Sequence, residues 1–373
     1  MFPYELLRRY PDAEAKNLFA VDAADRLLID TAAPVLDDRR IAIIGDNYGA
    51  ITLAALHHGA RDIRVHQDSI VSELALDANA ARLDSDSAAA YTHSPLNEKL
   101  VRDAQVVLMR LPRSLDALAE ITELIARHAG RDVAVYASGM IKHMTPAMNA
   151  VLATHFTTVT ASLARQKARV LTAALPTRPD TSRWPTCTFD HETGLWVCAH
   201  GGVFSGSTID IGTRFLLSVC TSAVPEANRV IDLGCGTGIL ATSLAVHRPS
   251  AQVIASDCSA TAVASARATA LANRVADRVT VVRDDALSQQ PDSSADLILL
   301  NPPFHSGAAV HTGVAHKLFA DTGRVIAPNG EVWTVWNSHL NYWNALEKLI
   351  GPTRQVARNA KFTITASTKS SQP

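Results

Sequence analysis

The sequence lacks long apolar runs and a strong net charge. No stretch of its 373 residues supplies the ~18 apolar positions that a membrane-spanning helix needs. The first ten residues include Glu5, Arg8 and Arg9 and have no apolar signal-peptide core. A formal net charge of -1 gives no global field that would attract a polyanion, so any nucleic-acid contact must come from a local basic patch. We therefore expect a cytoplasmic protein without membrane contacts.

Cysteine is also scarce, and its spacing disfavours a metal site. No two of the five cysteines form a C-x-x-C pair, so we expect no zinc and no other bound metal. Free cysteines are commonly buried as small hydrophobic residues. We expect reduced, mostly buried thiols at Cys187, Cys198, Cys220, Cys235 and Cys258.

The length and composition predict two folded domains. Hydrophobic residues make up 47% of the chain, which is typical of globular proteins, and domains usually run ~100–200 residues. The proline-rich segment 175–186, LPTRPDTSRWPT, has no periodicity and is expected to link domain 1–174 to domain 187–373. Each half alternates β-branched runs with longer Ala/Leu-rich stretches, which predicts α/β units with a parallel sheet.

The elements of the second half can be placed from their patterns. Apolar runs without alternation suit strands that are covered on both faces, and KFTITAS, which alternates, suits a closing edge strand. We expect strands over 229–233, 252–256, 279–283, 295–300, 330–335 and 361–367, and helices over 238–247, 259–273 and 310–326.

The two halves resemble each other, which indicates an internal duplication. At an offset of 189 residues, IAIIGDNYGAITLAAL lies over VIDLGCGTGILATSLA, and Asp68 falls on Asp257. One residue later in register, Pro112 falls on Pro302. The polar positions differ, however: Asp232 becomes Ile43, Gly236 becomes Asn47 and Asn301 becomes Leu111. We expect the first half to be a degenerate copy that has lost its ligand site.

The segment VIDLGCGTG predicts a strand, a glycine-rich turn and a helix that together bind a cofactor. Glycines allow a positive φ and a close approach of ligand to backbone, and the helix start offers free N–H groups. Asp232 would lie at the end of the strand, where it repels a pyrophosphate and suits an ammonium group. This favours S-adenosylmethionine over a dinucleotide. The residues expected to contact it here are Asp232, Gly234, Cys235, Gly236 and Gly238.

Two acidic positions after the next strands extend this prediction. Asp257, with Cys258 beside it, ends the second strand and can accept hydrogen bonds from a ribose diol, or can instead cap the following helix. In RDDA, an acidic side chain beside a small residue can hold an adenine amino group. We favour Asp285 with Ala286 for that contact, although Asp284 or Asp285 can also cap a turn.

The tetrapeptide Asn301-Pro302-Pro303-Phe304 follows the fourth strand and predicts the catalytic loop. A planar exocyclic amine is a poor nucleophile, because its lone pair is delocalised into the ring. Two acceptors on its hydrogens would redirect that lone pair, and the Asn301 side-chain oxygen and the Pro302 carbonyl can provide them, with the prolines fixing the backbone. The ring of Phe304 can stack on a base. The alternative is a rigid loop with a buried Phe.

With these motifs the chain resembles the ribosomal RNA guanine-N2 methyltransferases of the RsmC/RlmG type, a family of class I S-adenosylmethionine-dependent enzymes. The resemblance covers most of the chain. It rests on GGVFSGSTIDIGTRFLL, DLGCGTG, SDCSATAVASARATALANRV and NPPFHSG in the second half, and on DSIVSELALDAN and VVLMRLPRSLDAL, which are similar to the large-subunit members, in the first.

The resemblance implies two tandem Rossmann-like methyltransferase domains, the first of which has lost cofactor binding and engages RNA. It also implies that Phe204 lines the cofactor pocket, that Asp210 orients a loop over it, and that Arg214 lies just ahead of the cofactor loop. The alternatives are that Phe204 is buried and that Asp210 caps a helix. His305 is expected either to touch the nucleotide or to lie at the rim. The expected substrate is a guanine of naked or partly assembled ribosomal RNA, with 23S favoured over 16S, and the expected state is a monomer.

Because the chain is nearly neutral, RNA contacts must come from local groups of basic residues. Arginine can pair with a phosphate in a bidentate fashion, although an isolated surface charge is often only solvated. The residues expected to contact RNA are Arg110, Arg113, Arg165, Lys167, Arg169 and Lys361.

Three other functions remain compatible with parts of the sequence. An NPP-aromatic tetrapeptide also occurs in methyltransferases that act on adenine N6 or a protein glutamine, which carry equally planar amines. A non-catalytic RNA-binding assembly factor could retain a cofactor pocket. An NAD(P) oxidoreductase would lack a proton-transfer residue at suitable spacing, and Asp232 disfavours it.

Overall fold

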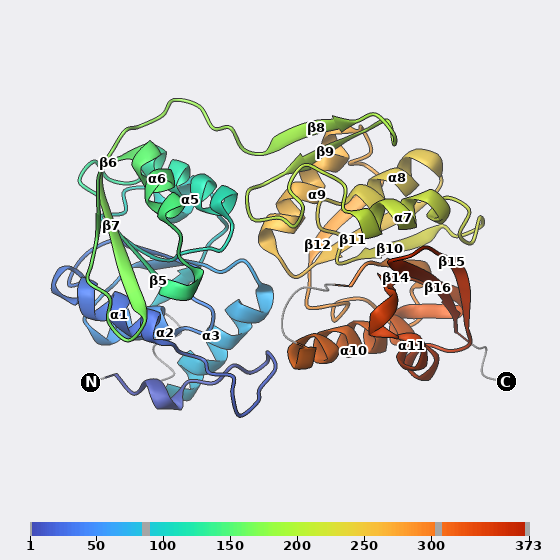
Figure 1. Ribbon diagram of the computed structural model, residues 1–373, viewed down its shortest axis with the longest axis horizontal. Helices are drawn as coiled ribbons and strands as arrows, with labels where there is room; N and C mark the ends of the chain where they lie inside the picture. The colour runs from blue at the N-terminus through green and yellow to red at the C-terminus, as the bar shows by residue number, and fades with distance from the viewer. Residues whose placement is uncertain (1, 84–89, 303–307, 370–373) are drawn as a thin grey trace. The chain divides into compact units, whose positions relative to one another are not determined.

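The computed structural model describes residues 2–83, 90–302 and 308–369, with the side chains of 308–312 left out. The chain divides into two compact units, Met1–Trp184 and Pro185–Pro373 (Figure 1). Each unit is described by itself below. Among the described helices, none has the length and hydrophobicity that crossing a bilayer would require.

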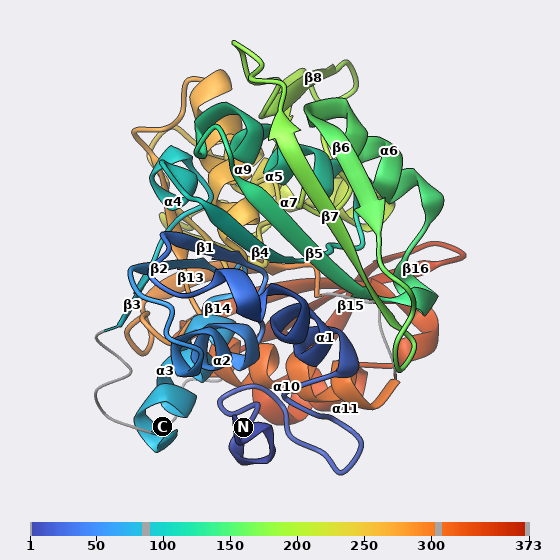
Figure 2. The same cartoon turned by 90° about the vertical axis from the view of Figure 1, so that its left-hand side faces the viewer.

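The first unit is a seven-stranded sheet with helices on both faces. Helices α1, α2 and α3 pack on one face around Leu28, Ile51 and Leu76, and α5 and α6 cover the other around Leu118 and Leu152 (Figure 2). Its helices are α1 (Ala23–Ala32), α2 (Ala50–His57), α3 (Ile70–Leu83), α4 (Glu98–Val101), α5 (Leu115–His128) and α6 (Pro146–His155); its strands are β1 (Ile41–Ile44), β2 (Ile63–His66), β3 (Tyr91–His93), β4 (Val106–Arg110), β5 (Ala134–Met140), β6 (Phe156–Ala161) and β7 (Ala168–Pro176).

The second unit repeats this arrangement and adds a hairpin before it. Apolar side chains of α7, α8 and α9 fill one side of the sheet, and those of α10 and α11 fill the other. Its helices are α7 (Ile211–Cys220), α8 (Ile239–His247), α9 (Ala260–Ala272), α10 (Ala308–Val325) and α11 (Trp343–Leu349); its strands are β8 (Thr186–Asp190), β9 (Leu195–Ala199), β10 (Arg229–Leu233), β11 (Gln252–Asp257), β12 (Val279–Arg283), β13 (Ala295–Leu300), β14 (Ile326–Asn337), β15 (Thr353–Arg358) and β16 (Phe362–Thr368).

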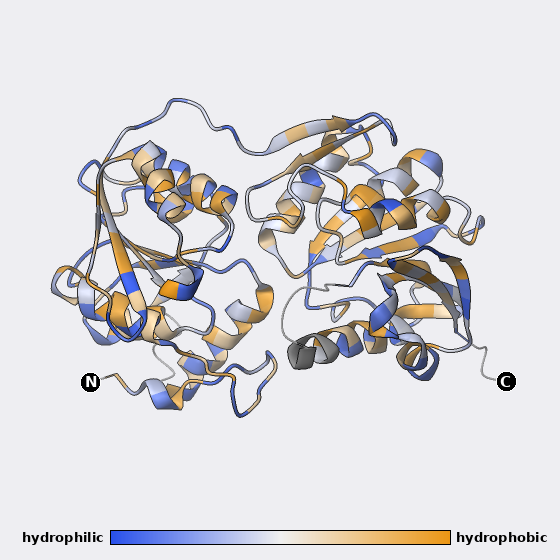
Figure 3. Ribbon diagram, in the orientation of Figure 1, coloured by the Kyte–Doolittle hydropathy of each residue, from blue (hydrophilic) through white to orange (hydrophobic). Residues whose placement is uncertain are grey.

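The two large sheets share one topology, which confirms the predicted α/β fold in two tandem copies. Their orders are β3-β2-β1-β4-β5-β7-β6 and β12-β11-β10-β13-β14-β16-β15. In each sheet, the first five strands of this order are parallel. The last strand in sequence, β7 or β16, is antiparallel to both of its neighbours. The central strands are mostly apolar (Figure 3), as expected for strands that helices cover on both faces.

The predicted strands over 229–233, 279–283 and 295–300 match the structure to the residue. The predicted edge position of the last strand is wrong. β16 lies between β14 and β15, and it is buried along nearly its whole length. The edge is instead the polar strand β15, TRQVAR, whose sequence gave no apolar signal.

The expectation of reduced thiols is corrected for two of the five cysteines. Cys187 and Cys198 form a disulfide, because they are direct neighbours across the antiparallel pair β8–β9. A C-x-x-C search misses such a pair, since the two residues are 11 positions apart. Cys220 and Cys235 are buried, as expected, whereas Cys258 is exposed.

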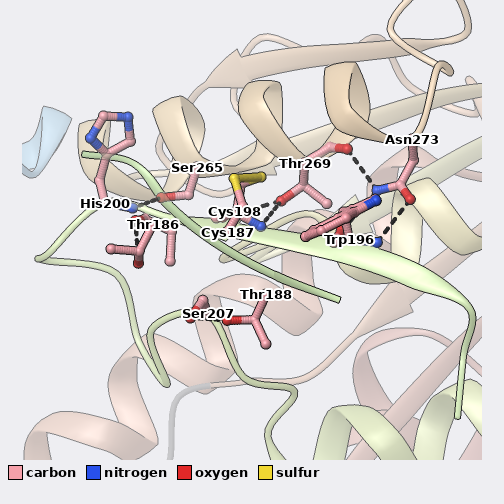
Figure 4. Close-up of a disulfide and its surroundings, with 11 residues drawn as sticks. Thr186, Cys187, Thr188, Trp196, Cys198, His200, Ser207, Ser265, Thr269 and Asn273 are labelled. Atoms are coloured by element: carbon pink, nitrogen blue, oxygen red, sulfur yellow. Dashed lines mark hydrogen bonds between the residues drawn. A yellow bond between two sulfur atoms is a disulfide. The ribbon is translucent and has the colours of Figure 1, made fainter. Parts of the chain in front are cut away.

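The hairpin is attached to helix α9 by polar side chains spaced four residues apart (Figure 4). Ser265 Oγ accepts a hydrogen bond from the His200 amide at 3.0 Å. Thr269 Oγ1 accepts from the Cys198 amide at 3.0 Å and donates to the Cys198 carbonyl at 3.1 Å. The Asn273 amide group likewise bonds the backbone of Trp196 in both directions. These side chains replace the strand neighbour that the free edge of β9 would otherwise need.

We predict that Thr269→Val destabilises the second unit by about 1–3 kcal/mol, because the buried amide and carbonyl of Cys198 lose their partner. Urea unfolding followed by tryptophan fluorescence measures this, since four of the five tryptophans lie beyond residue 185. The matched control is Thr242→Val, because the buried Thr242 hydroxyl has no hydrogen-bond partner in the described part of the chain. Equal effects of the two substitutions would contradict the anchoring role.

Candidate active site

The strand register brings three predicted site residues to one edge of the second sheet. Leu233 of β10 pairs with Ser256 of β11 on one side and with Leu300 of β13 on the other. The next residue of each strand or loop is therefore Gly234, Asp257 and Asn301 respectively. Carboxyl ends of parallel strands are where open α/β sheets bind ligands.

The glycine-rich loop has the conformation that the sequence predicted. Gly234, Gly236 and Gly238 all have φ between +54° and +71°, a region that side chains rarely adopt. Beside Gly236 there is open space, with no described atom within 4 Å of a Cβ built there. At Gly238 such a Cβ would lie 2.7 Å from that of Ala266, so the glycine lets α8 pack on α9. The backbone at Gly236 is thus open to close approach by a ligand.

Asp232 supplies a buried carboxylate below this loop. Its Oδ2 accepts a hydrogen bond from the Ala241 amide in the first turn of α8, at 3.0 Å. Its Oδ1 is buried, and no donor from the described residues reaches it. Burial raises the pKa of Asp232 to about 7. An unsatisfied buried acceptor is costly, so this oxygen fits a ligand that brings a donor, such as an ammonium group.

Asp257 joins the glycine loop to the start of α9. Its Oδ2 accepts from the Gly236 amide and its Oδ1 from the Ser259 amide, each at 3.0 Å. Asp257 therefore holds the loop, and its position at the end of β11 suits the proposed ribose contact. Cys235 is buried within the loop, and Cys258 is exposed beside Asp257.

The two acidic residues after β12 have different environments. Asp284 is fully buried and holds the next turn, since its carboxylate accepts from the Ser288 hydroxyl at 2.6 Å and from the Gln289 amide at 3.0 Å. Asp285 instead forms an ion pair with Lys317 at the surface. Because Asp284 is occupied, Asp285 and Ala286 stay our candidates for the adenine contact.

Asn301 is held by the first turn of α7. Its Nδ2 donates to Asp210 Oδ2 at 3.1 Å and to Thr213 Oγ1 at 2.8 Å. Its Oδ1 is buried without a donor from the described part of the chain. The carboxamide thus offers an acceptor oxygen to the site. Pro302 is also buried, whereas Pro303, Phe304 and His305 lie outside the described residues.

Residues that the family resemblance added lie on the segment after the hairpin and in the first turn of α7. Phe204 is 58% exposed, which leaves it accessible to a ligand. Asp210 is the N-cap of α7, which confirms the helix-capping alternative, and it also accepts a hydrogen bond from Asn301. Arg214 hydrogen-bonds Asp190 at 2.6 Å and keeps the pKa of that carboxyl well below its usual value. It therefore ties α7 to β8.

Sequence reasoning missed Gly212 and Thr213. A Cβ at Gly212 would lie 3.1 Å from Asp210 Oδ2 and 3.6 Å from Asn301 Nδ2, so the glycine leaves room for this contact. The signal was present as Asp-Ile-Gly-Thr, which is typical of a helix start, but its partner is about 90 residues away in sequence.

In the first unit the position of Asn301 is taken by Arg110. Ile44 pairs with Met109 there, as Leu233 pairs with Leu300 here, and Gly45 abuts Arg110. The predicted counterpart, Leu111, is thus wrong by one residue. The guanidinium of Arg110 is held by Asp22, the N-cap of α1, at 2.8 and 2.9 Å, and by Asp25.

In the first unit, the counterpart of the glycine loop is held by hydrogen bonds to side chains of the same unit. Asp46 is fully buried in the glycine-loop counterpart and accepts from the Gly49 and Thr52 amides. Tyr48 donates to Asp12 of the N-terminal segment at 2.6 Å, and Arg9 stacks on its ring. The first unit is therefore a degenerate copy, as the sequence predicted.

Comparison with known proteins agrees with this architecture. The family model "RLMG N-terminal domain" matches residues 4–177, and "Methyltransferase small domain" matches residues 194–366. Ribosomal RNA large subunit methyltransferase G of Stutzerimonas stutzeri is 35% identical over 97% of this chain and 96% of its own length, and that of Streptomyces coelicolor is 32% identical over 98% of each.

The chain belongs to the ribosomal RNA large subunit methyltransferase G family. A solved structure with the same fold is the T. thermophilus 16S rRNA N2 G1207 methyltransferase (RsmC) in complex with AdoMet and guanosine. It covers 93% of this chain and 92% of its own, with a TM-score of 0.73 and 21% identity.

The basic residues that were expected to contact RNA differ in exposure and in ion pairing. Arg110 is removed from that set, because its side chain is only 17% exposed and is paired with two carboxylates. Arg169 is half-buried, and its Nε has no acceptor among the described residues. Arg113, Arg165, Lys167 and Lys361 are exposed. Arg165 forms an ion pair with Asp30, and Lys361 lies over the ring of Phe362.

We predict a specific pH dependence of stability from Asp232. Its pKa is about 7 in the folded chain against a reference value of 3.8, so folding takes up a proton between those values. The unfolding free energy of the wild type, minus that of Asp232→Asn, should fall as the pH rises from about 4 to about 7 and stay constant above. Urea unfolding of both proteins from pH 5 to 9 measures this difference. A difference that does not change with pH would show that Asp232 is ionised throughout.

Proposed function

We propose that the protein transfers a methyl group from S-adenosylmethionine to the exocyclic N2 amine of a guanine in ribosomal RNA, with 23S rRNA as the favoured substrate. The observation that carries this proposal is the buried Asn301 Oδ1, whose amide nitrogen is held by Asp210 and Thr213. An acceptor fixed in this way fits an N–H of a planar amine. The relatives' name supports an RNA of the large subunit.

The residues present fit the proposed cofactor. The unsatisfied Asp232 Oδ1 suits the ammonium of its methionine part, and the open side of Gly236 leaves room for close approach to the backbone. Asp257 would bind the ribose hydroxyls, and Asp285 with Ala286 the adenine. Phe204, Cys235 and Cys258 are the further residues that we propose to contact the cofactor. S-adenosylmethionine supplies a sulfonium methyl group, an electrophile that needs no metal.

The residues of this chain then have to activate a weak nucleophile. Asn301 Oδ1 and the Pro302 carbonyl would accept the two N2 hydrogens, which localises the nitrogen lone pair and directs it at the methyl carbon. The N–C bond forms as the S–C bond breaks, and the amine releases one proton to water after attack. Because this proton is acidic once the nitrogen is alkylated, no general base is needed. Pro303 and Phe304 complete the proposed loop, where Phe304 would stack on the guanine.

A base inside a helix cannot reach this buried oxygen, so the guanine must be unpaired or flipped out. Naked or partly assembled RNA is therefore the proposed form of the substrate. We also propose that the protein acts as a monomer, because the internal duplication replaces dimerisation.

We predict that Asn301→Ala lowers turnover at least ~100-fold, the effect of removing one fixed polar group from a transition state. Affinity for S-adenosylmethionine, measured by calorimetry, should change less than twofold. The assay follows labelled methyl incorporation into rRNA from a strain that lacks the gene, with mass spectrometry of the nucleosides. Asn344→Ala, at an exposed position of α11, is the control.

Each alternative has its own outcome in that assay. N2-methylguanosine supports the proposal, and N6-methyladenosine or a methylated protein would replace it. Absence of any incorporation by the wild type, with intact cofactor binding, would favour a non-catalytic assembly factor. Binding of NADH in place of S-adenosylmethionine would favour an oxidoreductase.

For the first unit we propose RNA binding through Arg113, Arg165, Lys167 and Arg169, and for the second unit we propose Lys361. Arg165 and Lys167 lie on the turn before β7, beside the exposed Leu163, and Lys167 accepts a backbone bond from Ile141. The supporting observation is that these charges are accessible to a phosphate, unlike Arg110.

We predict that Arg165→Glu with Lys167→Glu weakens RNA binding and lowers the slope of log affinity against log salt by about 1 to 2, because phosphate contacts are lost. Arg169 is left unchanged, since its partly buried side chain could affect folding. The control is Arg40→Glu with Arg131→Glu, which makes the same change of charge before β1 and β5, at the opposite edge of the sheet. Equal RNA affinity of the two double variants would refute this patch.

A further inference from the structure

The first turn of α7 offers Asn301 two acceptors that leave its side chain only one orientation. Asp210 is the N-cap of this helix, and its Oδ2 accepts from the Thr213 amide at 3.0 Å. The same oxygen lies 3.1 Å from one end of the Asn301 carboxamide, and the Thr213 hydroxyl lies 2.8 Å from it. The end of the carboxamide that faces α7 therefore meets one carboxylate and one hydroxyl.

These partners decide which atom of the carboxamide faces the site. An ionised carboxylate can only accept hydrogen bonds, so the group beside Asp210 must be the NH₂ of Asn301. Thr213 lies 3.4 Å from Asp210 Oδ2 and can direct its own hydrogen there, which leaves its oxygen to accept from the same NH₂. A flipped carboxamide would place its oxygen against a carboxylate, and its NH₂ would face the reacting amine as a donor.

We infer that Asp210 and Thr213 are positioning residues that fix the orientation of Asn301, so that its Oδ1 accepts a hydrogen from the amine to be methylated. Gly212 is part of the same arrangement, because a side chain at this position would contact both Asp210 and Asn301. This inference rests on the proposed function for the identity of the amine, but the orientation itself is a property of the chain alone.

The first unit supports this interpretation independently. Its helix α1 begins with Asp22-Ala-Ala-Asp25, where α7 has Asp210-Ile-Gly-Thr213, and again the N-cap and the residue three positions later hold the side chain at the carboxyl end of the fourth strand. That side chain is Arg110, a guanidinium with no acceptor atom. The first unit therefore keeps the hydrogen bonds to the start of the helix, but its side chain lacks the acceptor oxygen that the reaction needs. This agrees with the predicted loss of its ligand site.

The test compares two substitutions that differ in one oxygen. Thr213→Val keeps the β-branched shape and the backbone N–H that Asp210 caps, but removes one acceptor of the Asn301 NH₂. Thr213→Ser keeps that acceptor. We expect Thr213→Val to lower kcat about tenfold, with KM for S-adenosylmethionine changed less than twofold, and Thr213→Ser to restore most of the turnover. Asp210→Ser, which still caps the helix, should lower kcat at least as much.

A second readout does not depend on turnover. In ¹⁵N-asparagine-labelled protein, the side-chain NH₂ signal of Asn301 is assigned by its loss in Asn301→Ala. Its exchange with solvent should be slow in the wild type and in Thr213→Ser, and at least tenfold faster in Thr213→Val. Thr242→Val serves as control for a buried Thr→Val change on a neighbouring helix and should leave this exchange rate unchanged.

The two readouts separate this inference from the proposed function. Faster exchange together with a lower kcat on guanine supports both. Faster exchange, with methyl transfer to a different acceptor or to none, supports the orientation of Asn301 and refutes guanine N2 as the substrate. Wild-type exchange and wild-type kcat in both Thr213→Val and Asp210→Ser would overturn the inference.

Discussion

A contact between the N-cap of a helix and the side chain at the carboxyl end of the fourth strand is common to both halves of this chain. In the second unit the N-cap Asp210 holds the amide nitrogen of Asn301, and the buried oxygen is left to the site. In the first unit the N-cap Asp22 holds Arg110, which can only donate. The backbone and the capping contact are alike in both units, so at this position the two units differ in whether the side chain can accept a hydrogen bond.

The cofactor side of the two units diverges in a similar way. In both units, a carboxylate accepts a hydrogen bond from the amide of the third residue of the helix after the glycine loop. The acceptor is Asp232 for Ala241 in the second unit and Asp46 for Thr52 in the first. Asp232 does so from the strand below and keeps one oxygen for a ligand. Asp46 does so from within the loop and uses both oxygens on backbone amides. Both helices are thus capped, but only Asp232 keeps an oxygen that can accept from a ligand.

Much of the fold was predictable because burial on both faces leaves a local signal. Strands β10, β12 and β13 are short apolar runs, and their bounds follow from the sequence. β15 and the β8–β9 hairpin were not predicted, since a polar edge and a strand supported by helix side chains have no such pattern. The position of Asn301 could be predicted from its motif, but its orientation could not, because Asp210 lies 91 residues earlier. Arg110 was misjudged for a related reason: the 189-residue offset of the glycine loops does not hold at the fourth strand, where register decides the correspondence.

The two unsatisfied oxygens also restrict the kind of ligand that this edge accepts. Asp232 Oδ1 and Asn301 Oδ1 are both buried acceptors without a donor in the described residues, and both lie at the carboxyl ends of adjacent strands. Leaving such atoms unpaired costs free energy, which a bound ligand recovers only if it brings donors to both. A dinucleotide would instead bring a pyrophosphate, whose oxygens accept, towards a carboxylate. An ammonium group on the cofactor and an amine on the substrate supply one donor for each oxygen, so the same polarity selects both partners of a methyl transfer.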